Sequence, residues 1–208
     1  MRRPLFIARQ ACRPSGLVGR ALLRLMEWET SHLNQEALDA LALVAEERVL
    51  EVGYGHGRTV AAAAACAPGA LLAGIDVSED AARFAARRCR AAIATGRVDL
   101  RVGDSAALPW PDGAFDKALS VHTLYFWPEP GRDLREVRRV LRPGGRFVLA
   151  FRERTEDAVA TFPPQIYRFY STADVIALLT TAGFSAVDIH TAKAGPDLRI
   201  AVAVAGPG

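Results

Sequence analysis

The sequence predicts an α/β protein with a mostly parallel sheet of seven strands and helices on both faces. Short apolar runs alternate with helical segments along the 208 residues, an order typical of parallel strands joined by crossover helices. A glycine-rich turn joins the first run to its helix. The last two runs, Ser185–Thr191 and Leu198–Ala205, have only a turn between them. We therefore expect a terminal hairpin that adds an antiparallel member to the sheet.

Bulk properties predict one globular unit. Half of the residues are hydrophobic, yet no apolar run approaches the roughly 20 residues that span a bilayer, so we expect no membrane span. The net charge is only +3, and arginine clusters at helical spacing with acids nearby favour solvated helix faces over a nucleic-acid surface. Cys12, Cys66 and Cys89 match no disulfide or metal pattern. They predict reduced thiols, a cytoplasmic location and no metal site.

Residues 1–45 are expected to form an N-terminal arm and two covering helices, ahead of the main unit at residues 46–208. The arm is rich in arginine and has no acid before Glu27. Pro4, Pro14 and Gly16 interrupt any long helix there, so the arm is expected to be loosely ordered until a helix over Leu17–Trp28.

The second covering helix is expected to start at Asn34, a residue type that caps helix N-termini. Apolar residues then recur at helical spacing and predict a buried stripe. The stripe comprises Leu38, Leu41 and Val44.

The stretch from Arg48 to Thr59 organises the main unit. A short apolar strand ends in Gly53, Gly55 and Gly57, and an alanine-rich helix follows. Glycine turns at positive φ and lets a ligand lie on the backbone, and the helix N-terminus presents free amides. The dinucleotide-binding turn G-x-G-x-x-G would need its third glycine one residue later, at Arg58. A plain tight turn is the remaining alternative.

A carboxylate ends the second predicted strand, about 20 residues beyond the glycines. Asp76 could there accept hydrogen bonds from both hydroxyls of a ribose. The alternative is that Asp76 only caps the next helix, but Ser78 is better placed for that task. We therefore favour the ribose role, which would put Val77 against the base of the nucleoside.

Several phrases, in order, resemble one family. E-x-G-x-G-x-G from Glu51 resembles motif I of the class I S-adenosylmethionine (SAM) dependent methyltransferases. L-P-W-P-D-G-A-F-D before the fourth strand, R-P-G-G at Arg142–Gly145 and A-G-F at Ala182–Phe184 resemble the methyltransferase type 11 group, which is similar to the ubiquinone and menaquinone C-methyltransferases. The resemblance runs from about Glu46 to Val204.

This resemblance implies a Rossmann-like class I methyltransferase fold, SAM as cofactor and S-adenosylhomocysteine as product. It implies that an acid after the third strand accepts from the exocyclic amine of adenine, although a capping role is the alternative for that acid, Asp104. The expected cofactor-binding residues are Glu51, Gly53, Tyr54, Gly55, His56, Gly57, Asp76, Val77, Gly103, Asp104, Ser105 and Ser120.

The catalytic candidates follow the fourth strand, because ligands of open α/β sheets lie beyond the carboxyl ends of the strands. His122 could act as a general base, since the pKa of histidine lies near neutrality, or could only hydrogen-bond the cofactor. Tyr125 is the second candidate. With Trp127 it could wall the acceptor pocket, where aromatic faces attract a sulfonium, although both could equally pack in the core.

The acceptor is expected to be a small molecule. DNA amino-methyltransferases carry Pro-Pro after the fourth strand and cytosine C5 enzymes need Pro-Cys; neither occurs there, so nucleic acid is not expected as a substrate. The resemblance implies that the N-terminal helices and the aromatic segment Arg152–Ser171 cover the acceptor site, although simple packing onto the sheet is the favoured alternative for the N-terminal residues. The candidate substrate-binding residues are Met26, Trp28, Trp127, Arg152, Tyr167 and Tyr170.

The leading hypothesis is direct SN2 methyl transfer from SAM to O, N or C of a metabolite or natural product. A non-catalytic SAM-binding protein is the first alternative. An NAD(P)-dependent reductase is less favoured, because no tyrosine has a lysine four residues later as a proton donor. The sequence leaves the acceptor and the oligomeric state open.

Overall fold

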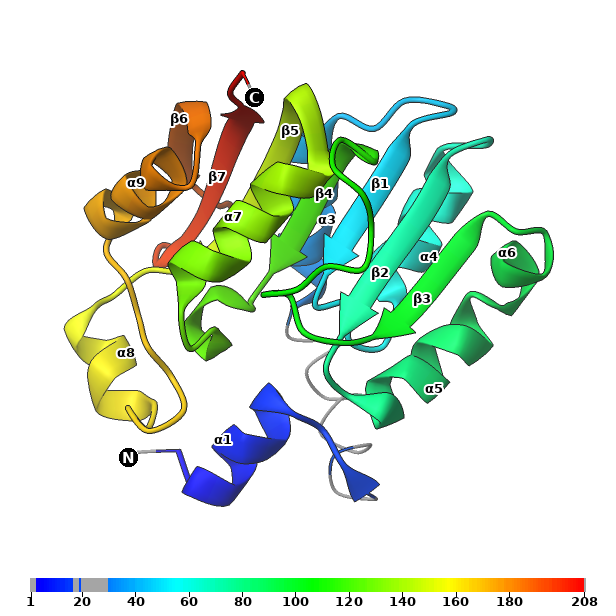
Figure 1. Cartoon of the computed structure of the whole chain (residues 1–208). Coiled ribbons are helices and arrows are strands. Elements are labelled where there is room, and N and C mark those ends of the chain that lie inside the picture. Colours follow the sequence, from blue (N-terminus) through cyan, green and yellow to red (C-terminus); the bar gives the residue numbers. More distant parts are fainter. Residues whose placement is uncertain (1–2, 17–18, 20–29, 208) are drawn as a thin grey trace.

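Seven strands form one sheet in the order β3-β2-β1-β4-β5-β7-β6 (Figure 1). The computed structural model describes residues 3–16, 19 and 30–207. The first five strands are parallel, whereas β7 runs antiparallel to both β5 and β6. The predicted class I methyltransferase topology is therefore confirmed. The strands are β1 Arg48–Val52, β2 Leu71–Asp76, β3 Val98–Val102, β4 Phe115–Val121, β5 Leu141–Arg152, β6 Phe184–Thr191 and β7 Leu198–Ala205.

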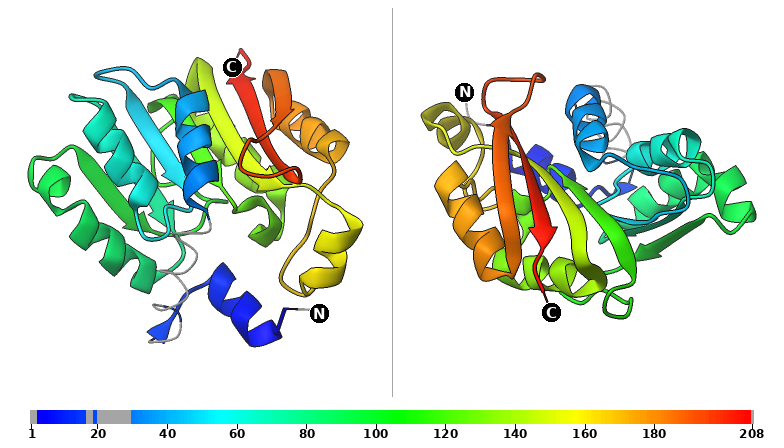
Figure 2. Two further views of the ribbon diagram at one scale, coloured as in Figure 1. Left: turned by 180° about the vertical axis from the view of Figure 1, so that it is seen from behind. Right: turned by 90° about the horizontal axis from the view of Figure 1, so that it is seen from above.

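Helices cover both faces of the sheet (Figure 2). One apolar core joins the sheet to α3, α4, α5 and α6, and a second core joins it to α7 and α9. The helices are α1 Leu5–Cys12, α3 Ser31–Leu41, α4 Arg58–Cys66, α5 Glu79–Arg88, α6 Arg90–Ala94, α7 Pro130–Val140, α8 Glu156–Thr161 and α9 Thr172–Thr181, with a 3-10 turn η1 at Leu124–Phe126.

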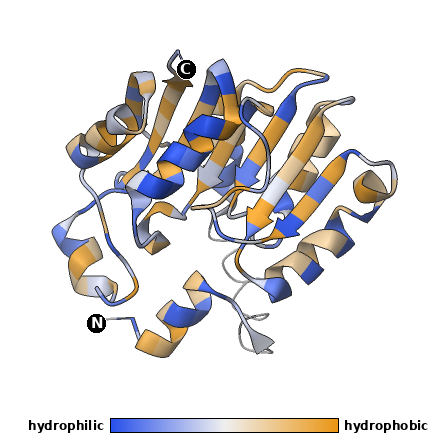
Figure 3. Cartoon of the chain, viewed as in Figure 1, coloured by the Kyte–Doolittle hydropathy of each residue, from blue (hydrophilic) through white to orange (hydrophobic). Residues whose placement is uncertain are grey.

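Helix α7 shows how the sequence pattern selects the buried face. Leu134, Val137 and Val140 recur at helical spacing and are fully buried, while charged residues occupy the opposite face. Figure 3 shows this as alternating hydrophobic and hydrophilic bands along α7. Pro130 occupies the first turn, where its missing N–H has no intrahelical partner to lose.

The register of the central strands aligns the site residues. Glu51 on β1 lies opposite Gly74 on β2 and Leu119 on β4, and Asp76 lies opposite Val102 on β3. Because these strands are parallel, their carboxyl ends meet at one edge of the sheet. The glycine turn, Asp76 and the residues after β3 and β4 therefore converge there.

The N-terminal arm differs from the prediction. Residues Leu5–Cys12 form helix α1, with Ala8 and Ala11 buried, so the arm is helical well before Leu17. Pro4 lies immediately outside the helix and does not interrupt it, because a proline at a helix start loses no hydrogen bond. Apart from Gly19, the predicted helix over Leu17–Trp28 lies outside the described residues.

The predictions of where the second covering helix starts and which residues form its buried stripe were also partly wrong. Helix α3 begins at Ser31, with Thr30 in the N-cap position, so Asn34 lies inside its first turn. Leu38 and Leu41 are buried as expected, but Val44 lies beyond the helix and is 58% exposed. The helix ends at Leu41 because Ala42 adopts a left-handed conformation.

None of the helices in the described ranges is long and apolar enough to cross a membrane.

Candidate active site

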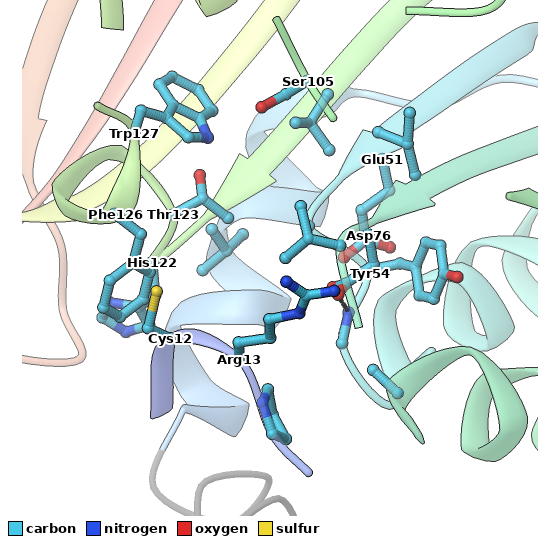
Figure 4. Close-up of a pocket in the computed structure, with 18 of the residues that line it drawn as sticks. Cys12, Arg13, Glu51, Tyr54, Asp76, Ser105, His122, Thr123, Phe126 and Trp127 are labelled. Carbon is cyan, nitrogen blue, oxygen red and sulfur yellow. Dashed lines mark hydrogen bonds between the residues drawn. The ribbon is translucent and has the colours of Figure 1, made fainter. Parts of the chain in front are cut away.

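A cavity of about 610 Å³ opens at the carboxyl ends of β1 to β4 (Figure 4). This is where an open α/β sheet binds its ligand. The expected site residues that line it are Glu51, Gly53, Tyr54, Gly55, His56, Asp76, Val77, Gly103, Asp104, Ser105, His122 and Trp127. Two other expected residues, Met26 and Trp28, lie outside the described part of the chain.

The three loop glycines all have positive φ but serve different ends. A side chain on Gly53 would strike the methyl group of Thr123, and one on Gly57 would lie 2.7 Å from the Cβ of Ala85 in α5. Gly57 does not line the cavity, so in this structure it permits close helix packing. At Gly55, by contrast, a Cβ atom would meet no described atom within 4 Å. Gly55 is thus the position that leaves room for a ligand.

Asp76 ties the glycine loop to the start of α5. Its Oδ2 accepts from the Gly55 N–H at 2.9 Å, and its Oδ1 accepts from the Ser78 N–H at 2.9 Å. Burial raises the pKa of Asp76, and these two amides partly offset that rise. Each carboxylate oxygen has two lone pairs, so both can accept another hydrogen bond. Ser78 caps α5 by accepting from Ala81 N–H at 3.2 Å, as expected.

Glu51 presents an acceptor atom with no protein partner. Its side chain is buried, one oxygen accepts from Thr59 and the Val60 amide, and Oε2 has no hydrogen-bond partner among the described residues. Burial raises the pKa of Glu51 to about 8, and the nearby charge of Asp76 adds to that rise. Buried acceptors normally find a donor. A ligand that brings N–H groups or positive charge would lower this pKa and give Oε2 a partner, so Glu51 fits such a ligand.

The pKa of Glu51 predicts a pH-dependent stability. Because its folded pKa of about 8 exceeds the usual value near 4.5, the folded state holds the proton more tightly, and stability falls as pH rises between these values. Glu51→Gln removes this dependence. We expect the variant to equal the wild type near pH 5 and to exceed it by about 1–2 kcal/mol at pH 8.5, since water entering the cavity relaxes part of the shift. Urea unfolding at both pH values measures this difference, and parallel pH dependences of the two proteins would contradict it.

The end of β3 contacts a residue that sequence reasoning missed. Asp104 is exposed, and its Oδ1 accepts from the Ala106 N–H at 2.9 Å, so it closes a local turn while facing the cavity. Ser105 donates to Asp133, which is 1% exposed, lines the cavity and leaves Oδ2 without a partner among the described residues. Sequence reasoning assigned this stretch to a solvated helix face. The position of Asp133 in the first turn of α7, directly after the β4 loop, was the available signal.

His122 has an unusual backbone and a neutral ring. Its φ is 60°, and its N–H donates to Ala150 O at 2.9 Å. The ring Nδ1 contacts the hydroxyl of Tyr125. Burial, assisted by the charge of Arg152, lowers the pKa of His122 to about 4. The imidazole is therefore uncharged at neutral pH.

Several expected site residues lie behind the cavity wall. Ser120 is fully buried and donates to Val52 O at 2.9 Å, which joins the ends of β1 and β4. Tyr125 and Tyr167 pack in an aromatic cluster with Phe126 and Phe169. Arg152 forms an ion pair with Asp197, and Tyr170 lines a separate surface pocket. Ser120, Tyr125, Arg152, Tyr167 and Tyr170 are all absent from the described lining of the main cavity.

The N-terminal segment, at the end of α1 and directly after it, forms one wall of the cavity, whereas the sequence analysis expected the N-terminal cover to come from later helices. Cys12, Arg13 and Pro14 line the cavity, and Figure 4 shows the Cys12 and Arg13 side chains at its lower edge. Pro14 O accepts from the Ser78 hydroxyl at 2.8 Å, and Gly16 N–H donates to Asp80 at 2.9 Å. The expected cover from the N-terminal region thus includes α1 and the residues directly after it.

Ser78 both caps α5 and holds this segment, so its removal should have two effects. We expect Ser78→Ala to lose about 1–2 kcal/mol of stability and to speed amide exchange in residues 3–16 several-fold. Ser171→Ala is the matched control, because Ser171 caps α9 in the same way, on a helix remote from the Ser78 tie. Hydrogen exchange read by mass spectrometry should show faster exchange at residues 3–16 in the first variant alone; equal exchange in both would contradict the tie.

The strand order and the cavity at the carboxyl ends of the strands are those of a methyltransferase, and comparisons with known proteins agree with this class. A family model described as a methyltransferase domain matches residues 50–149. The O-methyltransferase rstn1 of Aspergillus nomiae is 30% identical over 172 residues, 78% of this chain and 75% of that protein. The chain belongs to the class I SAM-dependent methyltransferases, in the type 11 group.

The relatives differ in how much of their length this chain covers and in their sequence identity to it. The uncharacterized methyltransferase YdaC of Bacillus subtilis is 28% identical over 183 residues, 88% of this chain and 96% of that protein. Several other curated relatives are longer, and the chain spans less than half of their length. The crystal structure of the [4+2]-cyclase SpnF superposes with a TM-score of 0.74 at 23% identity, covering 85% of this chain and 81% of that one. That likeness concerns the fold.

Proposed function

We propose that this protein transfers a methyl group from SAM to a small-molecule acceptor, at oxygen in preference to nitrogen or carbon. The observation that carries the proposal is the open space at Gly55, in a cavity that Asp76 and Glu51 also line. The preference for oxygen rests on relatives named as O-methyltransferases.

The residues on the wall fit the groups of SAM. Asp76 can accept from the ribose hydroxyls, and Val77, Asp104 and Ser105, which line the same cavity, are assigned to adenine. The orphan oxygen of Glu51 suits the positively charged end of the cofactor. When bound, SAM supplies an electrophilic methyl group on a sulfonium.

The protein's own task is then to orient the acceptor and exclude water. Phe126 and Trp127 form an aromatic wall that His122 adjoins (Figure 4), and the N-terminal segment closes the cavity beside it.

Calorimetric titration with SAM, and separately with NADH, tests the proposal. We expect a micromolar dissociation constant for SAM and no response to NADH. Acceptors can then be screened by release of S-adenosylhomocysteine. Binding of NADH in place of SAM would instead support a reductase and overturn the proposal.

A non-catalytic SAM-binding role is the second candidate. This alternative stays open because a fold does not by itself determine the chemistry of its site. SAM binding without S-adenosylhomocysteine release across a broad acceptor panel would favour this second candidate.

We also propose a cytoplasmic location, on the evidence of three free thiols at Cys12, Cys66 and Cys89.

A further inference from the structure

The contact between His122 and Tyr125 determines which ring nitrogen of His122 carries the proton. Tyr125 is buried behind the cavity wall, and its hydroxyl lies against Nδ1 of His122. The same hydroxyl oxygen accepts the backbone N–H of Arg152.

With one lone pair occupied by Arg152, the hydroxyl hydrogen of Tyr125 needs an acceptor. Among the described residues, Nδ1 of His122 is the acceptor that it meets. The reverse arrangement, in which Nδ1–H donates to Tyr125, would leave the hydroxyl hydrogen buried without a partner. That penalty disfavours the reverse arrangement by roughly tenfold or more. The proton of the neutral ring therefore resides on Nε2.

We expect Nε2, the ring nitrogen that Tyr125 leaves free, to be directed toward the cavity. His122 lines the cavity whereas Tyr125 does not, and the two nitrogens lie on different edges of the ring. Figure 4 shows His122 beside Phe126 and Cys12, across the cavity from Glu51 and Asp76. Among the described residues, the charged and titratable groups on the His122 side are Arg152, Tyr125 and Tyr167 behind the wall, and Cys12 and Arg13 from the N-terminal segment. None of these named groups is a carboxylate that would stabilise an imidazolium.

We infer that His122 is a hydrogen-bond donor to the acceptor, not a general base, and that the acceptor is an oxygen acid already ionised at neutral pH: a carboxylate, or an acidic enol or phenol. The inference rests on the proposed methyl transfer. An Nε2–H group can hold one lone pair of an anionic oxygen and leave another free to attack. Tyr125 acts through His122 and is therefore a positioning residue.

Such an acceptor removes the need to move a proton during the reaction. The electron pair of the anionic oxygen forms the new C–O bond, and the sulfur keeps the pair of the broken S–C bond. Alcohols and ammonium groups would need a base that Nε2–H cannot supply. They are therefore expected to be poor acceptors.

Nitrogen NMR of the histidine rings tests the donor assignment without any acceptor. The chain has four histidines, so the ring signals of His122 are identified by their loss in His122→Gln. We expect a neutral ring protonated on Nε2 that does not titrate between pH 5.5 and 8. Tyr125→Phe should release Nδ1 and mix the two tautomers, whereas Tyr167→Phe, a matched control in the same cluster, should leave the ring unchanged. A proton on Nδ1, or titration near pH 6.5, would overturn the inference.

A second measurement tests the acceptor class. Binding of S-adenosylhomocysteine by the protein is measured first. Failure to bind it would count against the proposed function, whereas the nitrogen NMR signals of the His122 ring test the donor assignment independently. Methylation rates are then compared for decanoate, benzoate, 4-nitrophenol, phenol and benzyl alcohol at equal concentrations. We expect the ionised acids to exceed benzyl alcohol at least tenfold, and equal or faster reaction of benzyl alcohol would overturn the acceptor class.

Discussion

Gly55→Leu is expected to weaken SAM binding at least 100-fold while the sheet still folds. Its Cβ would enter space where no described atom lies within 4 Å, in the cavity lined by the two acids that we assign to the cofactor. The substitution should also lower the stability of the protein through backbone strain, because the residue has a φ of +51° and a left-handed conformation costs a non-glycine residue about 1–2 kcal/mol. Calorimetry gives the affinity and urea unfolding gives the stability.

Gly96→Leu separates the two contributions. Gly96 has a φ of +71° and equally open surroundings, but it lies between α6 and β3, away from the cavity. Both variants should lose similar stability, and Gly55→Leu alone should lose SAM affinity. If Gly55→Leu binds SAM as tightly as Gly96→Leu does, the cofactor does not lie on the glycine loop.

Asp76→Ala is expected to weaken SAM binding by about 1.5–3 kcal/mol, the scale of hydrogen bonds to a charged group, or roughly 10- to 150-fold. The substitution removes the acceptor for the ribose hydroxyls. It also removes the bonds to the Gly55 and Ser78 amides, which hold the loop in shape.

Asp76→Asn distinguishes these two contributions. The amide oxygen can keep one of the two loop bonds, and loss of a buried charge offsets part of the folding cost. We expect near wild-type stability with an intermediate loss of SAM affinity. Unchanged affinity in both variants, measured by calorimetry, would remove Asp76 from the cofactor site.

The sequence predicted the cofactor end of the site better than the acceptor end. Gly55, Asp76 and Glu51 lie on or directly after strands, where alternation and strand order fix their direction. The wall made by Cys12 and Arg13 depends on how a distant helix packs, which periodicity does not encode.

Side chains in the loop after β4 show the same limit. His122 and Trp127 reach the cavity, but Tyr125 turns away into the aromatic cluster. The 3-10 turn η1 over Leu124–Phe126 determines the direction of the Tyr125 side chain, and no local sequence pattern predicts so short a turn. Asp133 was missed because a buried acid and a solvated one look alike in a charged helix.

The left-handed backbone of His122 has a consequence for the evolution of the protein. A histidine at a φ of 60° adopts a conformation that only glycine takes without steric cost. Glycine would relieve this strain, but it would leave the buried Tyr125 hydroxyl without its imidazole partner and would remove the imidazole from the cavity. Backbone conformation and side-chain contacts therefore favour different residues at this single position, so a histidine retained here in a descendant would indicate selection on its side chain.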